Sequence, residues 1–210
     1  MNEFDVIRRI SALLPPAPPE VLVPLGDDCA VLMIGDMTWV AASDMLVSGH
    51  HFKDWATPED VGYKAVAVNA SDVAAMGGTP RFILASGGAP DPETALRCSD
   101  GILEACERFG VYPLGGDTTR AGALTVDVAI LGELATQPVL RSGASPGDLL
   151  AVTGELGASH VRHPHVGQQQ EHERCCGEAD PEHHREPGRG GVQLGVAQHD
   201  LERFDHALGV

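Results

Sequence analysis

The stretch of sequence that decides the fold is residues 57–80, TPEDVGYKAVAVNASDVAAMGGTP. It begins with a threonine that can cap a helix, a proline at the first helical position and two acidic residues in the first turn. It closes with two glycines and a proline, which commonly end a helix. This pattern predicts a helix that begins after Thr57 and runs to about Met76.

The interior of this predicted helix is apolar on every side, from Ala65 to Met76. A helix that is apolar all round is normally buried, so we expect it to pack in the core. Asn69 and Asp72 interrupt the run, and their spacing of three residues places both on one face of the helix. Because an unpartnered buried carboxylate is costly, these two side chains need each other or a ligand.

Strand-like and helix-like patterns alternate on both sides of this helix. A second long helix is expected from Asp91 to Gly110, and a short amphipathic helix ends before Pro15. Two long helices between strands are typical of an α/β domain with a mixed, α+β type of sheet. The expected strands are residues 29–34 and 38–46 around a Gly35-Asp36 turn, and residues 81–86, 124–134 and 148–153.

Composition limits the classes of partner. The 210 residues carry 30 acidic and 14 basic side chains, which argues against a nucleic-acid-binding protein because such proteins present a basic face. No apolar run is long enough to span a membrane, and the N-terminus is unlike a signal peptide. The five cysteines lack the spacing of a disulfide framework, as expected for reduced thiols. These features predict a cytoplasmic protein that binds neither nucleic acid nor membrane.

Residues 158–210 differ in character from the rest of the chain. They hold eight of the ten histidines, runs such as QQQ and GRGG, and few large apolar side chains. Burial can hardly offset the entropy of ordering such a segment, so we expect a low-complexity, mostly disordered tail. A His/Cys metal-binding tract is the alternative, although the adjacent Cys175 and Cys176 suit one tetrahedral site poorly. Out-of-frame translation would also produce so abrupt a change.

Four short motifs place an aspartate among small or glycine residues. Small neighbours allow a large anionic ligand to approach the backbone, and carboxylates are hard oxygen ligands suited to Mg²⁺. Because Mg²⁺ takes one or two carboxylates and otherwise phosphate oxygens, scattered aspartates indicate several ions around a nucleotide. The motifs are Gly26-Asp27-Asp28, Ser43-Asp44, Asn69-Ala70-Ser71-Asp72 and Gly115-Gly116-Asp117.

The acidic motifs also have structural interpretations. One member of the pair Asp27 and Asp28 is expected to form a turn by hydrogen-bonding nearby backbone, and Asp27 is the better candidate. Ser43 and Asp44 could lie on a solvated strand face. Their apolar neighbours nevertheless favour a partner for the carboxylate, because an unpaired charge in such surroundings is costly.

Three further features each allow both a structural and a ligand-binding interpretation. The Gly115-Gly116 pair is typical of a glycine-rich turn, which is common and on its own a weak phosphate signal. His51 follows a second histidine after a glycine, and could be a surface residue or contact a substrate. Arg141 could lie in an ordinary loop or contact a phosphate.

Taken together and in order, the motifs resemble the thiamine-monophosphate kinases, members of the aminoimidazole ribonucleotide synthetase-like superfamily. The resemblance covers residues 1 to about 157 and rests on GDDCAVL, SDMLVSGHHF, YKAVAVNASDVAAMGGTPRF, LGGDTTRAG and RSGASPGD. The NASDVAAMGG type of helix is common to the superfamily, whereas DMLVSGHHF and GGDTTR indicate this kinase family. Selenophosphate synthetases and hydrogenase-maturation proteins are disfavoured, because the sequence shows neither their reactive Cys or Sec segment nor a Cys tail.

The resemblance implies an enzyme that transfers the γ-phosphoryl group of ATP to thiamine monophosphate, yielding thiamine diphosphate, with several Mg²⁺ ions. Metal ions would neutralise charge and align an in-line transfer, so no side chain is required as a strong base. A homodimer formed through the sheet of the N-terminal domain is also implied. By the family's motifs the metal ligands are Asp28, Ser43, Asp44, Asp72 and Asp117, the nucleotide contacts are Gly116, Asp117 and Arg141, and the substrate contact is His51.

The resemblance also divides the chain. Residues 1–140 are expected to form an N-terminal, Mg- and ATP-binding α/β domain, residues 141–157 the start of a connection to a second domain, and residues 158–210 the tail. The kinases' second domain carries a D-x-S-D-G motif, and nothing in residues 158–210 matches it. We therefore expect weak activity or none. The competing hypothesis is a non-catalytic remnant that dimerises and at most binds Mg²⁺ or nucleotide weakly.

Overall fold

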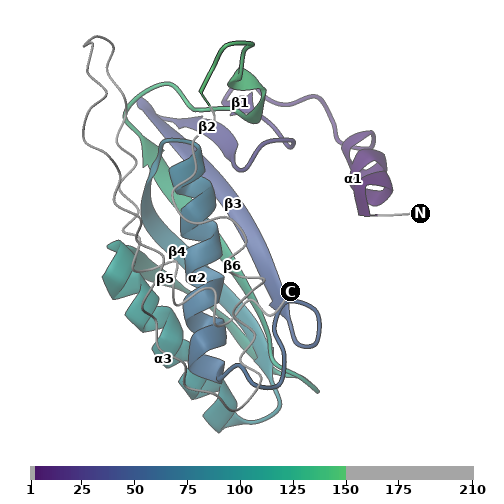
Figure 1. The fold of residues 1–210 in the computed structure, drawn as a ribbon, viewed down its shortest axis with the longest axis vertical. Helices are drawn as coiled ribbons and strands as arrows, with labels where there is room; N and C mark the ends of the chain where they lie inside the picture. The colour runs from purple at the N-terminus through teal and green to yellow at the C-terminus, as the bar shows by residue number, and fades with distance from the viewer. Residues whose placement is uncertain (1–2, 150–210) are drawn as a thin grey trace, which may run out of the picture.

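A six-stranded mixed sheet forms the body of the chain (Figure 1), for which a computed structural model describes residues 3–149. The strand order is β1-β2-β3-β6-β4-β5; only β4 and β5 pair in parallel, and every other neighbouring pair is antiparallel. This arrangement confirms the expected fold class. The elements are α1 (Glu3–Ser11), β1 (Val21–Val23), β2 (Ala30–Ile34), β3 (Met37–Val47), α2 (Pro58–Ala75), β4 (Thr79–Ala89), α3 (Pro92–Phe109), β5 (Tyr112–Arg120), β6 (Thr125–Leu134) and a 3₁₀ turn (Arg141–Gly143).

The helix predicted from the deciding stretch is α2. Its N-cap is Thr57, whose hydroxyl accepts the Asp60 N–H while the Asp60 carboxylate accepts the Thr57 N–H. This reciprocal arrangement satisfies two backbone donors that a helix start leaves free. Gly77, at a φ of +78°, follows the last turn. More than half of the α2 residues are buried, as its all-round apolar character predicted.

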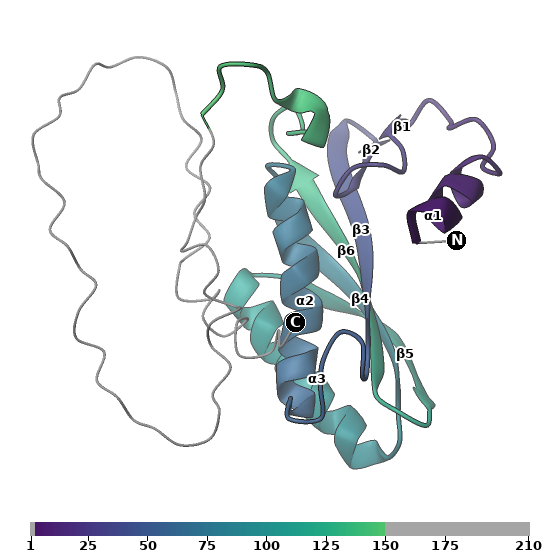
Figure 2. The same ribbon diagram turned by 45° about the vertical axis from the view of Figure 1, so that its right-hand side comes forward.

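Both long helices cover the same face of the sheet (Figure 2). Helix α2 packs on β3 and β6, and α3 packs on β4 and β5. Glycines allow the two helices to approach each other closely: a Cβ atom at Gly62 would lie 2.0 Å from the Cys98 carbonyl oxygen, and one at Gly101 would lie 1.9 Å from that of Glu59. Backbone therefore meets backbone where α2 and α3 cross.

Strand β6 shows how the two faces of the sheet differ. Its alternate residues Val126, Val128 and Ile130 are buried against the helices, whereas the residues between them are only partly buried. Because side chains alternate across a strand, the pairing register assigns each residue of the neighbouring strands to one of two faces. We call the face that carries α2 and α3 the helix-covered face and the opposite one the open face. Large apolar side chains on the open face, such as Met45 and Leu84, are about half exposed, at 52% and 48%.

The glycine-rich segment at Gly115 and Gly116 is not a turn, contrary to the sequence interpretation. It lies within β5, where it pairs with β4 in parallel after a register shift between Ile83 and Leu84. A Cβ atom at Gly116 would lie 1.6 Å from the Ala85 carbonyl oxygen. The glycine is thus required by close approach to a neighbouring strand, which one sequence cannot distinguish from a turn.

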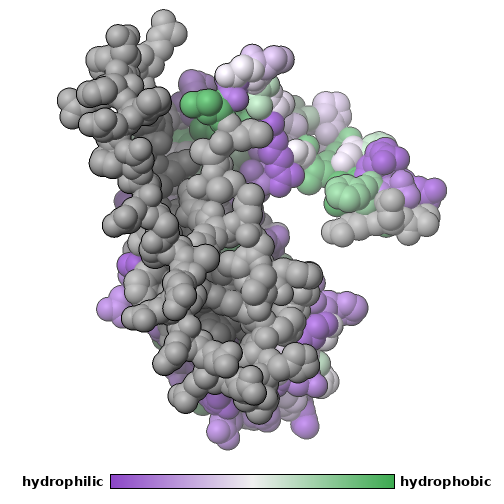
Figure 3. Space-filling view, viewed as in Figure 1, coloured by the Kyte–Doolittle hydropathy of each residue, from purple (hydrophilic) through white to green (hydrophobic). Residues whose placement is uncertain are grey.

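Two expectations concern the ends of the chain. The short helix α1 ends at Ser11, before Pro15, but its apolar side chains are exposed, Ile10 by 51%. Helix α1 stands away from the sheet, and apolar surface is visible on this arm (Figure 3). Of the expected strand at 148–153, only the first two residues are described, and they are not in a strand. The tail at 158–210 lies outside the described residues. No helix within residues 3–149 is long and apolar enough to cross a membrane.

Candidate functional site

Three of the predicted metal ligands come together on the helix-covered side of the sheet. Asp28 precedes β2, Asp44 lies in β3 opposite Val128, and Asp72 lies in the last turn of α2. Their proximity is evident from Asp72, whose pKa is raised to about 6 by partial burial and then by the negative charges of Asp44 and Asp28. Like charges from three distant segments thus share one site.

Arg141 supplies the positive charge at this cluster. Its Nε donates to Asp28 Oδ1 at 2.9 Å, and a second guanidinium nitrogen contacts the same oxygen. Its backbone N–H donates to Asp27 Oδ2 at 3.2 Å, while Asp27 Oδ1 accepts the Asp28 N–H at 3.0 Å. Asp27 is therefore the turn-forming member of the pair, as predicted, and Asp28 is the member that meets the cation. The ion pair raises the pKa of Arg141 and keeps its guanidinium charged.

Cys29 is a neighbour of the cluster that sequence reasoning did not connect to it. Its side chain is 2% exposed, and its pKa is raised to about 12 by burial and then by nearby carboxylates, Asp72 first. The thiol therefore stays protonated and uncharged beside the acidic groups. In the sequence, only its position directly after Asp27 and Asp28 could have indicated that Cys29 lies near the acidic cluster.

Asn69 does not pair with Asp72 in the way that their spacing suggested. Its side chain is fully buried, and its Nδ2 donates to the Ala65 carbonyl oxygen at 2.8 Å. The Asn69 Oδ1 atom has no hydrogen-bond partner among the described residues. Asp44, for which a partner was expected, is exposed, and within residues 3–149 it makes no hydrogen bond or ion pair. Electrostatic crowding, rather than direct pairing, characterises this cluster.

Ser43 lies on the other face of the sheet from its neighbour Asp44. Adjacent strand residues point to opposite sides, and the Ser43 hydroxyl donates to Asp127 Oδ1 of β6 at 3.0 Å. Asp117 also belongs to this open face: it stands opposite Ser86 of β4, which in turn stands opposite Asp127. The structure therefore divides the predicted metal ligands between two faces. Across residues 3–149, no three His, Cys, Asp or Glu side chains stand close enough to hold a metal ion.

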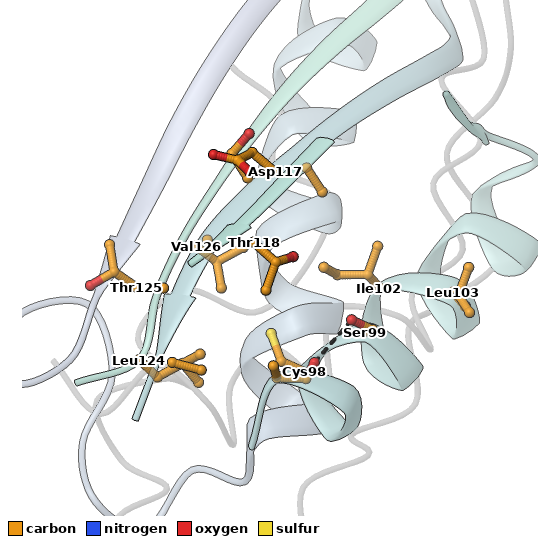
Figure 4. A pocket seen from close by; sticks show the side chains of 15 residues that line it. Cys98, Ser99, Ile102, Leu103, Asp117, Thr118, Leu124, Thr125 and Val126 are labelled. Carbon is orange, nitrogen blue, oxygen red and sulfur yellow. Dashed lines mark hydrogen bonds between the residues drawn. The ribbon is translucent and has the colours of Figure 1, made fainter. Parts of the chain in front are cut away.

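A cavity of about 200 Å³ lies between α3 and the ends of β4, β5 and β6 (Figure 4). Its lining is mainly apolar, from Cys98 and Ile102 of α3 to Leu124 and Val126 beside the sheet. In Figure 4 the Thr118 side chain points into the cavity, whereas the Asp117 carboxylate points away from it. The segment predicted to contact a nucleotide thus borders an apolar cavity large enough for part of a small molecule.

His51 lies in the loop that follows β3. Its Nδ1 accepts the Val47 N–H at 2.9 Å, and its carbonyl oxygen accepts a hydrogen bond from the Lys64 ammonium at 2.7 Å. Lys64 is only 4% exposed, which is unusual for a lysine. Sequence reasoning did not select Lys64, although a lysine at the start of an otherwise apolar run was a usable signal.

Comparison with known proteins gives a consistent result. A family model described as "AIR synthase related protein, N-terminal domain" matches residues 26–134. A thiamine-monophosphate kinase of Mycobacterium tuberculosis is 43% identical over 165 residues, covering 76% of this chain and 49% of the relative. The enzyme of the same name from Bacillus subtilis is 39% identical over 172 residues, covering 76% and 51%.

Solved structures show the same likeness. The structure named "AaThiL complexed with AMPPCP and TMP" matches with a TM-score of 0.60 and 33% identity, covering 68% of this chain and 45% of the other. A structure of tt0281 from Thermus thermophilus matches with a TM-score of 0.63 and 30% identity, covering 70% and 48%. The chain spans about half the length of the curated relatives it matches.

Proposed function

The chain belongs to the AIR synthase related proteins by its N-terminal domain, and from this membership we propose that it serves the reaction of the thiamine-monophosphate kinases. In this reaction the γ-phosphoryl group of ATP passes to thiamine monophosphate and yields thiamine diphosphate. The observation that carries the proposal is the convergence of Asp28, Asp44 and Asp72 beside Arg141. Carboxylates crowded against one guanidinium suit the binding of Mg²⁺ and phosphate groups.

The residues of the cluster fit Mg²⁺ by their chemistry. All three carboxylates offer hard oxygen ligands, and the pKa of Asp72 is raised first by partial burial and then by the charges of Asp44 and Asp28, while the charge of Arg141 lowers it only in part. One or two of Asp28, Asp44 and Asp72 would hold each ion together with phosphate oxygens, because no three acidic side chains within residues 3–149 stand close enough to share one. The metal would supply charge neutralisation on the phosphoryl oxygens. Arg141 would donate from its guanidinium to phosphoryl oxygens while its backbone N–H stays on Asp27. Cys29, held as a thiol, excludes water and adds no charge.

The nucleotide base is proposed to occupy the apolar cavity beside α3. A base needs a mainly apolar slot with few polar groups, which the cavity between Ile102, Leu124 and Thr118 offers. Gly116 precedes Asp117 and Thr118 in β5, and its lack of a side chain lets this strand pack closely against Ala85 of β4 beside the cavity. This assignment follows the predicted nucleotide contacts at Gly116 and Asp117.

A homodimer through the open face is the proposed assembly. The face combines half-exposed apolar side chains with two unpaired edges: β5 is an edge strand, and β2 pairs with β3 only as far as Ala41. Two open faces packed about a two-fold axis would bury this surface and bring β5 of one copy toward the free edge of the partner's β3. At that edge, Asp117 of one copy would approach the cluster formed by Asp28, Asp44 and Asp72 in the second copy. Within its own chain Asp117 cannot join this cluster, because it lies on the other face of the sheet.

The proposal is tested on the full chain with two measurements. A coupled assay with ATP, Mg²⁺ and thiamine monophosphate measures turnover, and calorimetry measures Mg²⁺-dependent binding of AMPPCP. We expect Asp72→Asn to abolish both and Asp36→Asn, in the exposed turn between β2 and β3, to change neither. Binding without turnover would support the non-catalytic nucleotide-binding alternative. Absence of binding and turnover in a folded chain would contradict both functions.

Mixing variants tests the dimer. If Asp117 completes a site in the partner, Asp72→Asn and Asp117→Asn chains each lose Mg²⁺-dependent AMPPCP binding, but an equal mixture regains about a quarter of the wild-type sites, because half of the dimers are mixed and each of these has one intact site. A mixture that binds no better than either variant alone would contradict the shared site, and sedimentation as a monomer would contradict the dimer itself.

A further inference from the structure

We infer that Lys64 is a positioning residue for His51, fixing its imidazole as an Nε2–H donor that faces thiamine monophosphate. The inference rests on the proposed function for the identity of the ligand. The arrangement of the loop itself rests on the hydrogen bonds of residues 47–53 and on the burial of Lys64.

The loop after β3 is closely tied by its own backbone. The Gly49 N–H donates to the Phe52 carbonyl oxygen at 2.9 Å, and the His51 N–H donates to that of Val47 at 3.0 Å. Phe52 is only 7% exposed and anchors the loop in the core, while Gly49 takes a φ of +80° that allows the chain to reverse. His51 is therefore exposed on a loop with a defined backbone rather than on a free one.

The tautomer of His51 follows from its bond to Val47. A backbone N–H can only donate, so the His51 Nδ1 atom that lies 2.9 Å from it accepts and carries no proton. A neutral imidazole then carries its proton on Nε2. His51 thereby presents a donor to any ligand, suited to a phosphate oxygen or a ring nitrogen and unsuited to another donor.

Lys64, in α2, restrains the backbone of His51. Its ammonium crosses from α2 to the His51 carbonyl oxygen at 2.7 Å, while the His51 ring is held separately by Val47. Among residues 3–149 no carboxylate pairs with this ammonium, and its burial lowers the pKa of Lys64. A hydrogen bond from a charged donor is among the stronger ones, so this one partly buried contact can restrain the peptide that carries His51.

Lys53 offers a matched comparison within the same loop. Its ammonium also donates to a loop carbonyl, that of Gly49, at 3.0 Å, but the contact is exposed. Water can replace an exposed hydrogen bond at little cost, whereas the Lys64 contact is partly buried and its ammonium is shielded from water, so its loss is harder to compensate. Replacing Lys53 with methionine should therefore leave His51 in place, and replacing Lys64 with methionine should release it.

The experiment begins with the wild-type full chain. Nitrogen-15 NMR of the histidine rings reports the tautomer, and we expect His51 to be protonated on Nε2 and unprotonated on Nδ1. Hydrogen exchange of the Val47 amide reports the bond to Nδ1. In Lys64→Met we expect this amide to exchange about tenfold faster or more, and thiamine monophosphate to bind about tenfold more weakly by calorimetry. Lys53→Met should match wild type in all three measurements.

These measurements distinguish failure of the proposed function from failure of the inference about Lys64. If wild type does not bind thiamine monophosphate while the tautomer and exchange results hold, the proposed function fails and the positioning of His51 by Lys64 stands. An Nδ1–H tautomer in wild type overturns the inference without any variant, and so does not depend on how Lys64→Met folds. Unchanged Val47 exchange in Lys64→Met, or equal affinity of Lys64→Met and a wild type that binds, overturns it as well.

Discussion

The two faces of the sheet carry acidic residues in opposite settings. On the helix-covered face, the partly buried Asp72 lies near the exposed Asp44 and Arg141, and its pKa rises to about 6. On the open face, Asp117 and Asp127 are separated by a strand and stand among residues that the helices do not cover. The same residue type thus forms an energetically costly cluster on one side and an ordinary polar row on the other.

The difference shows what the helices contribute to the candidate site. Helix α2 brings Asp72 to β3 and removes part of its hydration, which makes the negative charges interact strongly. Without a covering layer, carboxylates at similar spacing remain solvated and interact weakly. A cation is therefore expected to stabilise the covered face, whereas on the open face the proposed dimer would be needed to complete a site.

The largest expected effect comes from separating the helices that cover one face. In Gly101→Ala the new Cβ would lie 1.9 Å from the Glu59 carbonyl oxygen, so α3 must move away from α2. We expect a loss of about 3 kcal/mol or more in the free energy of unfolding, measured by urea denaturation. Gly122→Ala is the control, because nothing lies within 4 Å of its Cβ. Equal stability of the two variants would show that the close helix crossing is wrong.

A smaller effect is expected from the charge of Asp72. The folded pKa of about 6 exceeds the ordinary value of 3.8, so the folded chain holds this proton more tightly than the unfolded chain does. The contribution to stability is present at acidic pH and is lost as pH rises through this window. Asp72→Asn should therefore resemble wild type near pH 4 and be more stable by about 2 kcal/mol at pH 7 without Mg²⁺.

Urea denaturation at the two pH values measures this difference. Asp117→Asn, on the open face, is the matched control and should change the free energy of unfolding by less than about 0.5 kcal/mol. Millimolar Mg²⁺ should stabilise wild type and leave Asp72→Asn unchanged. A wild type whose stability rises between pH 4 and pH 7 relative to Asp72→Asn would contradict the assigned repulsion.

The smallest effect is expected at the ion pair between Arg141 and Asp28. The Arg141 side chain is 65% exposed, so Arg141→Gln should lower the urea midpoint only slightly. Its charge also lowers the pKa of Asp72, so the variant should shift the titration of that carboxyl to higher pH, as followed by carbon-13 NMR. Ser43→Ala, on the other face, should leave this titration unchanged. A shift of the Asp72 titration in both variants would contradict the electrostatic separation of the two faces.

Much of the fold could be predicted from local patterns. The bounds of α2 follow from Thr57 and Gly77, and those of α3 from Asp91 and Gly110, because caps act within a few residues. The turn at Gly35 likewise fixes β2 and β3. Strand β5 was missed, because a glycine that permits close strand packing looks the same in sequence as one in a turn.

The candidate site was predicted in part. The chemistry of Asp28, Asp44 and Asp72 could be inferred from their small and apolar neighbours, and the structure brings these three together. The positions of Ser43 and Asp117 could not, because the face on which a strand residue points depends on register with other strands. Their roles as metal ligands, and that of His51 as a substrate contact, remain predictions, as do the domain boundaries.

The sequence by itself determined the helices, most strands and the residue types able to bind metal and phosphate, since these depend on interactions between near neighbours. Only the tertiary structure decided that Asp44 and Asp72 lie near enough for their charges to interact while Ser43 points to the other face, and that Lys64 reaches the loop of His51. Such contacts join residues that are distant in sequence. Their energies arise from burial and charge proximity, which exist only once α2 has packed on the sheet.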